Sequence, residues 1–154
     1  MGVEIERKFL VASEAWRDEV ASHSDIRQGY LAVNGGNTVR VRIKDDAAFL
    51  TVKSAGPAIR RQEFEYPIPL NDAEALLALR CGRLIEKRRH VVPHGALRFE
   101  VDVFSGDLAG LVIAEIELPD ETTAFVRPAW LGEEVTDDPR YANASLATNG
   151  APSK

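Results

Sequence analysis

The chain has 154 residues, of which 45% are hydrophobic and 28% are charged, and its formal net charge is −5. This composition is that of a globular chain, and the length suits one domain with a substantial core, which argues against a disordered protein. The negative charge argues against a nucleic-acid surface, and no apolar run is long enough for a signal peptide or a membrane span.

Alternation of polar and apolar residues predicts about eight strands, most of them joined by tight turns. In chain order, the predicted strands cover residues 3–11, 26–33, 38–44, 49–54, 60–68, 84–92, 97–104 and 111–118. The hairpin turn at 34–37 has the sequence Asn-Gly-Gly-Asn, whose residues tolerate positive φ. A second turn is expected at 93–95.

A few short helices are expected around these strands. Ser13 is a suitable N-cap for a helix that runs to about residue 21, and Asn71 for a helix over 72–79. After the last strand we expect a short helix at 121–125, a loop over 132–139 and a last helix at 140–147. Residues 148–154 are expected to form a loose tail of a single domain spanning 1–154.

The single cysteine, Cys81, cannot form an internal disulfide, and no Cys or His stands at metal-ligand spacing from it. We expect a structural thiol in a cytoplasmic protein. The three histidines, His23, His90 and His94, are expected at the surface.

The predicted elements indicate a mainly β (α+β) fold with an antiparallel sheet. Eight strands suit a closed barrel with a few peripheral helices. An ordinary sandwich with its charges in water is the alternative, because it produces a similar alternation.

Polar, mostly ionisable residues recur at every second position in seven of the strands, and residues two apart share one face of a strand. The opposite face is largely apolar, except on the sixth strand. The polar face is nearly all Glu, Asp, Lys and Arg, with acids on strands one, five, seven and eight, and bases on strands three, four and six. A face built for solubility would intersperse the signs. The pattern therefore favours a barrel with a charged interior, whose apolar outer face is covered by the helices.

A dense charged interior is unfavourable unless ligands and ions neutralise it. The bases suit a polyanion such as a polyphosphate, because Arg and Lys bind phosphate oxygens. They are Lys8, Arg40, Arg42, Lys53, Arg61, Lys87 and Arg89. The carboxylates suit hard cations such as Mg²⁺ or Mn²⁺. They are Glu4, Glu6, Glu63, Glu65, Glu100, Asp102, Glu115 and Glu117.

At these residues the chain resembles the CYTH superfamily of triphosphate tunnel metalloenzymes. The segment Glu4-Ile5-Glu6-Arg7-Lys8 matches that family's ExExK signature. The blocks VRVR, TVK, RQEFE, EKRR, FEVDVF and AEIEL follow in the family's order, so the resemblance covers residues 3–147. The closing LGEEVT, with Tyr141 and Asn143, is similar to the short bacterial members. The resemblance implies an eight-stranded antiparallel tunnel that hydrolyses or cyclises triphosphates with Mg²⁺ or Mn²⁺.

The resemblance also implies roles for individual residues. Phosphate binding falls to Lys8, Arg40, Arg42, Lys53, Lys87 and Arg89, and metal binding to Glu4, Glu6, Asp102, Glu115 and Glu117. Glu63, Glu65 and Glu100 line the same tunnel, where they either ligate a second ion or orient basic residues.

The tunnel-facing set contains no nucleophile, so water is the expected attacking group. Either a second metal ion or a protein base would activate it. Tyr30 is our candidate base, because a close Lys53 would favour the phenolate and lower a pKa that is ordinarily about 10. The alternative is that Tyr30 only packs at the tunnel rim.

The expected reaction is hydrolysis of inorganic tripolyphosphate to diphosphate and phosphate. Beyond Tyr30, the tunnel-facing set offers almost no aromatic residue to hold an organic group. Thiamine triphosphatase and adenylyl cyclase are the alternatives within the family. A non-catalytic polyphosphate- or nucleotide-binding module, or a dimerising scaffold, is the alternative from another class, although anion binding alone would not need so many carboxylates. We expect a monomer or homodimer whose partner is a small-molecule triphosphate.

Overall fold

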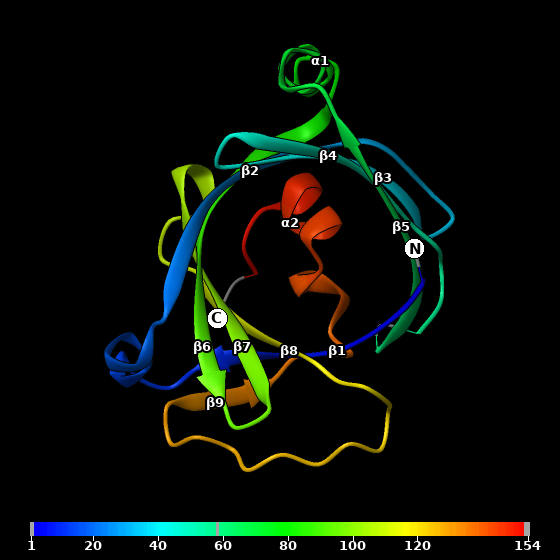
Figure 1. Cartoon of the computed structure of the whole chain (residues 1–154). Helices are drawn as coiled ribbons and strands as arrows, with labels where there is room; N and C mark the ends of the chain where they lie inside the picture. Colours follow the sequence, from blue (N-terminus) through cyan, green and yellow to red (C-terminus); the bar gives the residue numbers. More distant parts are fainter. Residues whose placement is uncertain (1, 58, 153–154) are drawn as a thin grey trace.

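An antiparallel sheet closes on itself into a barrel in the computed structural model, which describes residues 2–57 and 59–152 (Figure 1). Neighbouring strands follow the order β5-β4-β3-β2-β6-β7-β8-β1, and pairing of β1 with β5 completes the ring. The strands are β1 (Gly2–Val11), β2 (Ser22–Asn34), β3 (Asn37–Lys44), β4 (Ala47–Lys53), β5 (Arg60–Ile68), β6 (Cys81–His94), β7 (Leu97–Ser105) and β8 (Val112–Glu117). The predicted closed barrel is confirmed, and the sandwich alternative is wrong.

The strand β1 closes the barrel because its two ends have different neighbours. Residues 6–10 pair with β8 along one edge, whereas residues 2–5 pair with β5 along the other. Where the pairing with β5 has ended, Phe9 and Val11 at the other end of β1 pair with a ninth strand, β9 (Leu131–Glu134). The acidic composition of 132–139 predicts a loop, and this is wrong for the residues of β9. Glu134 accepts two hydrogen bonds from the Arg7 guanidinium, at 2.9 and 2.7 Å, which hold β9 against β1.

The predicted and observed bounds of the strands differ mainly next to the turns. The hairpin between β2 and β3 is confirmed, with Gly35 and Gly36 at φ of 60° and 88°. The strand β6 continues through residues 93 and 94, so its turn lies at Gly95, with φ of 60°, and Ala96.

The helices differ from the prediction in their bounds: the first is shorter, and the second has the predicted length but begins two residues earlier. They are the 3₁₀ helices η1 (Ala15–Glu19), η2 (Gly106–Leu108) and η3 (Pro139–Tyr141), and the α-helices α1 (Leu70–Leu77) and α2 (Asn143–Asn149). The helix predicted at 121–125 does not form, and that at 140–147 is divided at Ala142. The helix α2 extends through Thr148 and Asn149 of the expected tail, whose last residues, 153–154, lie outside the described residues. None of the helices in the described ranges is long and apolar enough to cross a membrane.

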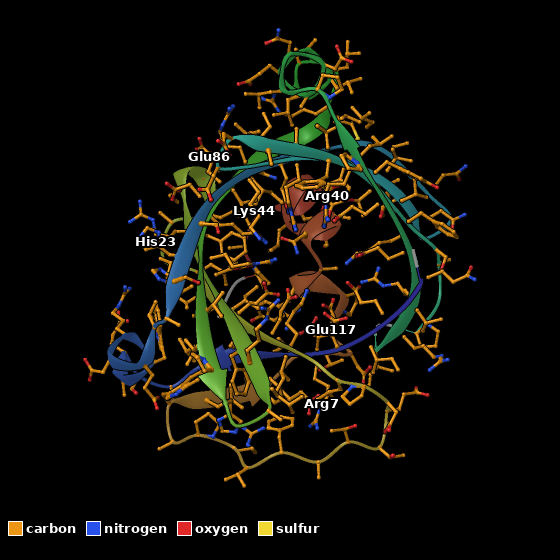
Figure 2. All side chains as sticks on the ribbon, in the orientation of Figure 1. Arg7, His23, Arg40, Lys44, Glu86 and Glu117 are labelled. Carbon is orange, nitrogen blue, oxygen red and sulfur yellow. The ribbon has the colours of Figure 1, made fainter. Side chains whose placement is uncertain are left out.

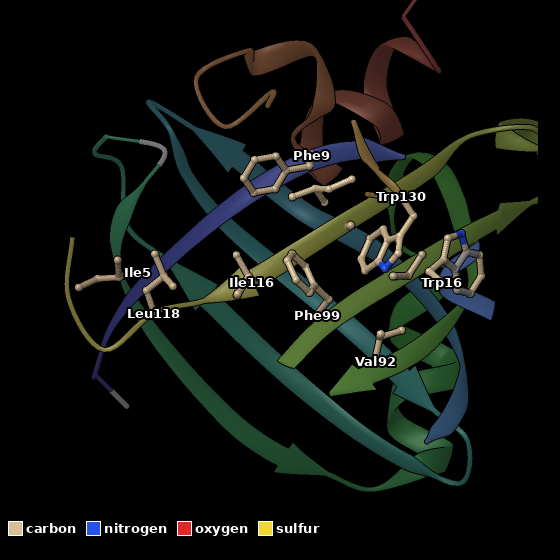
Figure 3. Packing of buried hydrophobic residues seen from close by; sticks show 11 residues of the cluster. Ile5, Phe9, Trp16, Val92, Phe99, Ile116, Leu118 and Trp130 are labelled. Carbon is tan, nitrogen blue, oxygen red and sulfur yellow. The ribbon is translucent and has the colours of Figure 1, made fainter. Parts of the chain in front are cut away.

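An apolar cluster covers the outer faces of β1, β7 and β8 (Figure 3). Phe9, Phe99 and Ile116 have no exposed surface there. The irregular segment after β8 supplies Trp130, whose ring lies 5.0 Å from that of Phe99. On the opposite side α1 packs on β2, β3 and β4 (Figure 1). The outer face is therefore covered by α1 and η1 and, against expectation, by an extended segment rather than a helix over β1, β7 and β8.

The barrel interior has an apolar end as well as a charged part. Ile85, Phe104 and Ile113 each lie two positions from a charged inward-facing residue, and they pack together with Leu146 and Ala147 of α2. Figure 1 shows α2 within the ring of strands when the barrel is viewed along its axis. The expectation that all helices lie on the outer face is therefore wrong for α2, which closes one end of the interior.

Candidate active site

A cavity of about 190 Å³ occupies the charged part of the barrel. Its lining includes all predicted site residues except two: Glu4, Glu6, Lys8, Tyr30, Arg40, Arg42, Lys53, Arg61, Glu63, Glu65, Arg89, Glu100, Glu115 and Glu117. Figure 2 shows Arg40 and Glu117 inside the ring, whereas Arg7 points away from it. The alternation along each strand therefore places these side chains as the sequence predicts.

The two exceptions, Lys87 and Asp102, lie behind the cavity wall. Their side chains are 0% and 1% exposed, and Lys87 Nζ lies 2.7 Å from Asp102 Oδ2. Asp102 also accepts two hydrogen bonds from the Arg89 guanidinium, at 2.8 and 2.9 Å. Burial by itself would raise the pKa of Asp102, but Arg89 and Lys87 outweigh it and lower the pKa to about 2. In this arrangement Asp102 is a buried counter-ion for two bases rather than part of the cavity surface.

The basic side of the cavity holds guanidinium groups without acceptors. The Nε atoms of Arg40 and Arg61 are buried and have no hydrogen-bond partner among the described residues. Burial, together with the neighbouring charges of Arg40 and Arg89, lowers the pKa of Arg42 to about 9. Buried donors normally find acceptors, so this group of arginines is suited to the oxygens of an anion.

The acidic side of the cavity holds more carboxylates than its bases compensate. Glu6 is paired in register with Glu117 on β8, and burial together with the charge of Glu115 raises the pKa of Glu6 to about 8. Burial also raises the pKa values of Glu4 and Glu117. Burial would do the same for Glu115, but Lys8 and Arg89 outweigh it and hold that pKa below its ordinary value. Glu4, Glu6 and Glu117 are therefore not fully compensated by the bases of the barrel.

These carboxylates fit a divalent cation by the chemistry of their donors, because Mg²⁺ and Mn²⁺ prefer hard oxygen ligands. Within residues 2–57 and 59–152, however, no three carboxylate, imidazole or thiol side chains converge into a preassembled metal site. Glu4 is held by Lys53 instead, at 2.9 Å from its Nζ. The acidic side can therefore accommodate a cation only if such ion pairs rearrange.

Both predicted catalytic residues line the cavity. Tyr30 is 5% exposed and packs beside the apolar end that α2 closes. Lys53 contacts the carboxylates of Glu4, at 2.9 Å, and Glu63, at 3.6 Å. Burial by itself lowers the pKa of Lys53, but Glu6 and Glu4 outweigh it and raise the pKa above its ordinary value. The ammonium form of Lys53 is therefore favoured.

Some residues of the site were not predicted. Asn143, with Ala142 and Ala144, brings the start of α2 to the cavity wall, and Thr38 of β3 also lines it. Gln28, which is fully buried, donates a hydrogen bond from Nε2 to Asn143 Oδ1 at 3.3 Å. Gln28 lies two residues from Tyr30 on the same strand, so the alternation that selected Tyr30 also indicates Gln28. Asn143 belongs to the closing segment that resembles the short bacterial family members, but no local pattern indicates its role in the site, because its site partners are distant in sequence.

Cysteine and histidine stay outside the cavity lining. Cys81 is exposed, and its Sγ donates a hydrogen bond to the backbone oxygen of Tyr30 at 3.2 Å. His23 is exposed, whereas His90 and His94 are half-buried against aromatic rings. The surface position predicted for the histidines is thus confirmed for His23 and only partly correct for the other two.

Comparisons with known proteins agree with this geometry. An inorganic triphosphatase of Acetivibrio thermocellus is 45% identical over 150 residues, which cover 97% of this chain and 96% of that protein. An inorganic triphosphatase of Nitrosomonas europaea is 42% identical over 149 residues, which cover 94% and 96% of the two chains. The crystal structure of the inorganic triphosphatase NE1496 matches with a TM-score of 0.73 and 38% identity over 99% of both chains. The family model of the CYTH domain matches residues 2–149. The chain therefore belongs to the CYTH domain family.

Proposed function

We propose that this protein hydrolyses inorganic tripolyphosphate to diphosphate and phosphate inside its barrel, with Mg²⁺ or Mn²⁺ as the metal ion. One observation carries the proposal: a single cavity joins the buried Nε donors of Arg40 and Arg61, which have no acceptor among the described residues, to half-buried carboxylates with raised pKa values, on Glu4 and Glu6. A polyphosphate with a divalent cation neutralises both sets together. The relatives named inorganic triphosphatase support the same assignment.

Substrate binding falls to the basic wall. The guanidinium forks of Arg40, Arg42 and Arg61, with the ammonium of Lys8, hold the phosphate oxygens and keep the chain of phosphates aligned for in-line attack. Asp102 holds Arg89 and Lys87 from behind the wall, so Lys87 and Asp102 act through their neighbours.

Glu4, Glu6, Glu115 and Glu117 would hold the cation, with Glu63, Glu65 and Glu100 close enough along the same wall to orient bases or assist. When bound, the cation supplies charge neutralisation and Lewis acidity at the phosphate oxygens. Among the residues of the chain, Tyr30 is the proposed base that removes a proton from the attacking water, and Lys53, whose ammonium group contacts Glu4 and Glu63, adds a positive charge to the same cavity. The apolar end around α2 excludes bulk water from that side of the cavity.

The cavity favours an inorganic substrate over a thiamine or adenine derivative. Tyr30 is the only aromatic side chain lining it within the described residues, so an organic group would meet almost entirely charged walls. The proposed binding partner is a small-molecule triphosphate. A monomeric or homodimeric state and a cytoplasmic location stay predictions.

The test is phosphate release by the purified protein. Tripolyphosphate, ATP, thiamine triphosphate and diphosphate are compared in Mg²⁺, in Mn²⁺ and in EDTA. We expect metal-dependent turnover of tripolyphosphate above all others and no turnover in EDTA. Preference for thiamine triphosphate, or cyclic AMP formed from ATP, would overturn the substrate, and binding without any turnover would support a non-catalytic module.

A matched pair of variants tests the role of the acidic wall. Glu6→Gln keeps the shape of the side chain but cannot ionise to a carboxylate that binds a cation, and we expect activity to fall about 100-fold or more because a bound metal contributes several kcal/mol. Glu19→Gln, on the exposed surface of η1, is the control and should retain wild-type activity.

A further inference from the structure

Two neutral amide side chains, Gln28 and Asn143, connect basic residues around the cavity. Oε1 of Gln28 accepts a hydrogen bond from Arg42 Nε at 2.7 Å, and Nε2 donates to Oδ1 of Asn143 at 3.3 Å. The same Asn143 oxygen accepts from Lys87 Nζ at 3.3 Å. Gln28 has no exposed surface, so a hydrogen-bond partner for each of its two polar atoms fixes its orientation.

These contacts continue into the ion pairs behind the wall. Lys87 contacts Asp102, and Asp102 forms a two-point contact with Arg89. The connected path therefore begins at the guanidinium of Arg42 and ends at that of Arg89, and both of these groups line the cavity.

The two ends of the path differ in charge. Arg89 contacts two carboxylates, those of Asp102 and Glu100, whereas Arg42 is held by an uncharged amide. Gln28 occupies only Nε of Arg42, which leaves the two terminal nitrogens for a two-point contact with a phosphate group. Arg42 thus keeps its full charge for a ligand while its orientation is fixed.

We propose that Gln28 and Asn143 are positioning residues of the substrate site. Gln28 directs the Arg42 guanidinium toward the polyphosphate without neutralising it, and Asn143 holds Gln28 and Lys87 from the start of α2. This inference rests on the proposed function and extends it to the C-terminal segment, since Gln28 and Asn143 are 115 positions apart in the sequence.

The experiment compares three site variants in two measurements. Calorimetry measures the affinity for tripolyphosphate in EDTA, and steady-state kinetics with Mn²⁺ separates KM from kcat. Gln28→Glu keeps an acceptor for Arg42 but adds a negative charge, so we expect Kd and KM to rise about 10-fold or more. Gln28→Met keeps the volume and removes the acceptor, and a smaller, several-fold rise is expected. Asn143→Ala should also raise Kd several-fold, and kcat should change less than KM in all three.

Gln62→Met is the matched control, because Gln62 is the exposed glutamine of β5. It should bind and turn over tripolyphosphate like the wild type. A purely structural Gln28 would give another result, in which thermal unfolding shifts in Gln28→Met but Kd does not. If Gln28→Met does not fold, Asn143→Ala, at a half-buried position, still decides the question.

The outcomes separate this inference from the function on which it rests. Wild-type binding with all site variants within twofold of the wild-type Kd would overturn the positioning role and leave the proposed function intact. Failure of the wild type both to bind tripolyphosphate in EDTA and to hydrolyse it with Mn²⁺ would overturn both.

Discussion

The ammonium group of Lys53 lies 2.9 Å from a carboxylate oxygen of Glu4, so a proposed catalytic residue and a proposed metal ligand hold each other inside the barrel. Glu63 approaches the same ammonium group at 3.6 Å. A cation that binds to Glu4 must therefore compete with Lys53 or displace it, because like charges at this separation repel strongly in a buried site.

Replacement of Lys53 should affect metal binding and turnover in opposite directions. In Lys53→Met, loss of the competing charge should tighten Mn²⁺ binding several-fold, while kcat falls about 100-fold because a positive charge that can stabilise the transition state is lost from the cavity. Calorimetric titration with Mn²⁺ and steady-state kinetics measure the two effects. Lys44→Met, at a lysine of β3 outside the cavity lining, is the control. Weaker Mn²⁺ binding in Lys53→Met would contradict the competition.

Tyr30→Phe tests the proposed base directly. The change removes one hydroxyl and keeps the ring that packs at the apolar end, so folding should be maintained. We expect kcat to fall about 100-fold with KM little changed, because a general base acts in the transition state. Tyr66→Phe is the control, since Tyr66 is 53% exposed on β5. Unchanged kcat would assign Tyr30 to packing alone.

Asp102→Asn should lower the free energy of unfolding but leave Mn²⁺ binding largely unchanged. Its carboxylate is buried between Lys87 and Arg89, and removal of one partner from a buried ion pair typically costs about 3–5 kcal/mol. Urea unfolding measures the loss, with the exposed Asp107→Asn as its control. The reverse result, a stable Asp102→Asn protein that no longer binds Mn²⁺, would return Asp102 to the metal ligands implied by the family resemblance.

Arg40→Met should weaken substrate binding without destabilising the protein. The Nε atom of Arg40 has no hydrogen-bond partner in the part of the chain that the structure describes, so its replacement removes an unsatisfied buried donor. We expect KM to rise about 30-fold or more, since loss of one member of a buried charge contact costs several kcal/mol. Arg60→Met, at an exposed position of β5, is the control for loss of an arginine. Equal KM values in the two variants would argue against phosphate binding by Arg40.

His90 should contribute to loss of stability in acid. Burial lowers its pKa below the ordinary value of 6.5, and Arg17, His23 and Arg88 act in the same direction. The folded state therefore favours the neutral imidazole. The stability is fully present above pH 6.5 and is lost as the pH falls through the lower pKa of the folded state.

His90→Gln should accordingly show a smaller decline in the free energy of unfolding between about pH 7 and about pH 5 than the wild type does. Fluorescence is a suitable probe, because the Trp16 ring lies 5.0 Å from that of His90. His94→Gln is the matched control. A wild-type slope in His90→Gln would show that other groups cause the acid sensitivity.

The residues that point into the barrel follow from the sequence, because alternation along a strand is a local property of the backbone. Arg40 and Arg42 face the interior while Val41 between them is buried under α1, as their spacing predicts. Polar, mostly charged residues recur with this period on seven strands, and this also favoured a closed barrel. Closure of the sheet lets its acidic strands face its basic strands across the interior.

The depth of each side chain along the barrel depends on the tertiary structure alone. Ile85, Lys87 and Arg89 share one face of β6, yet the first packs with α2, the second is buried against Asp102 and the third lines the cavity. Their surroundings are set by the register of β6 with β2 and β7 and by the position of α2, which bring together residues far apart in the chain. By itself, the sequence therefore determined the charged interior and the class of ligand that it suits. Only tertiary structure decided which charges meet the ligand, because that depends on contacts between distant segments rather than on strand periodicity.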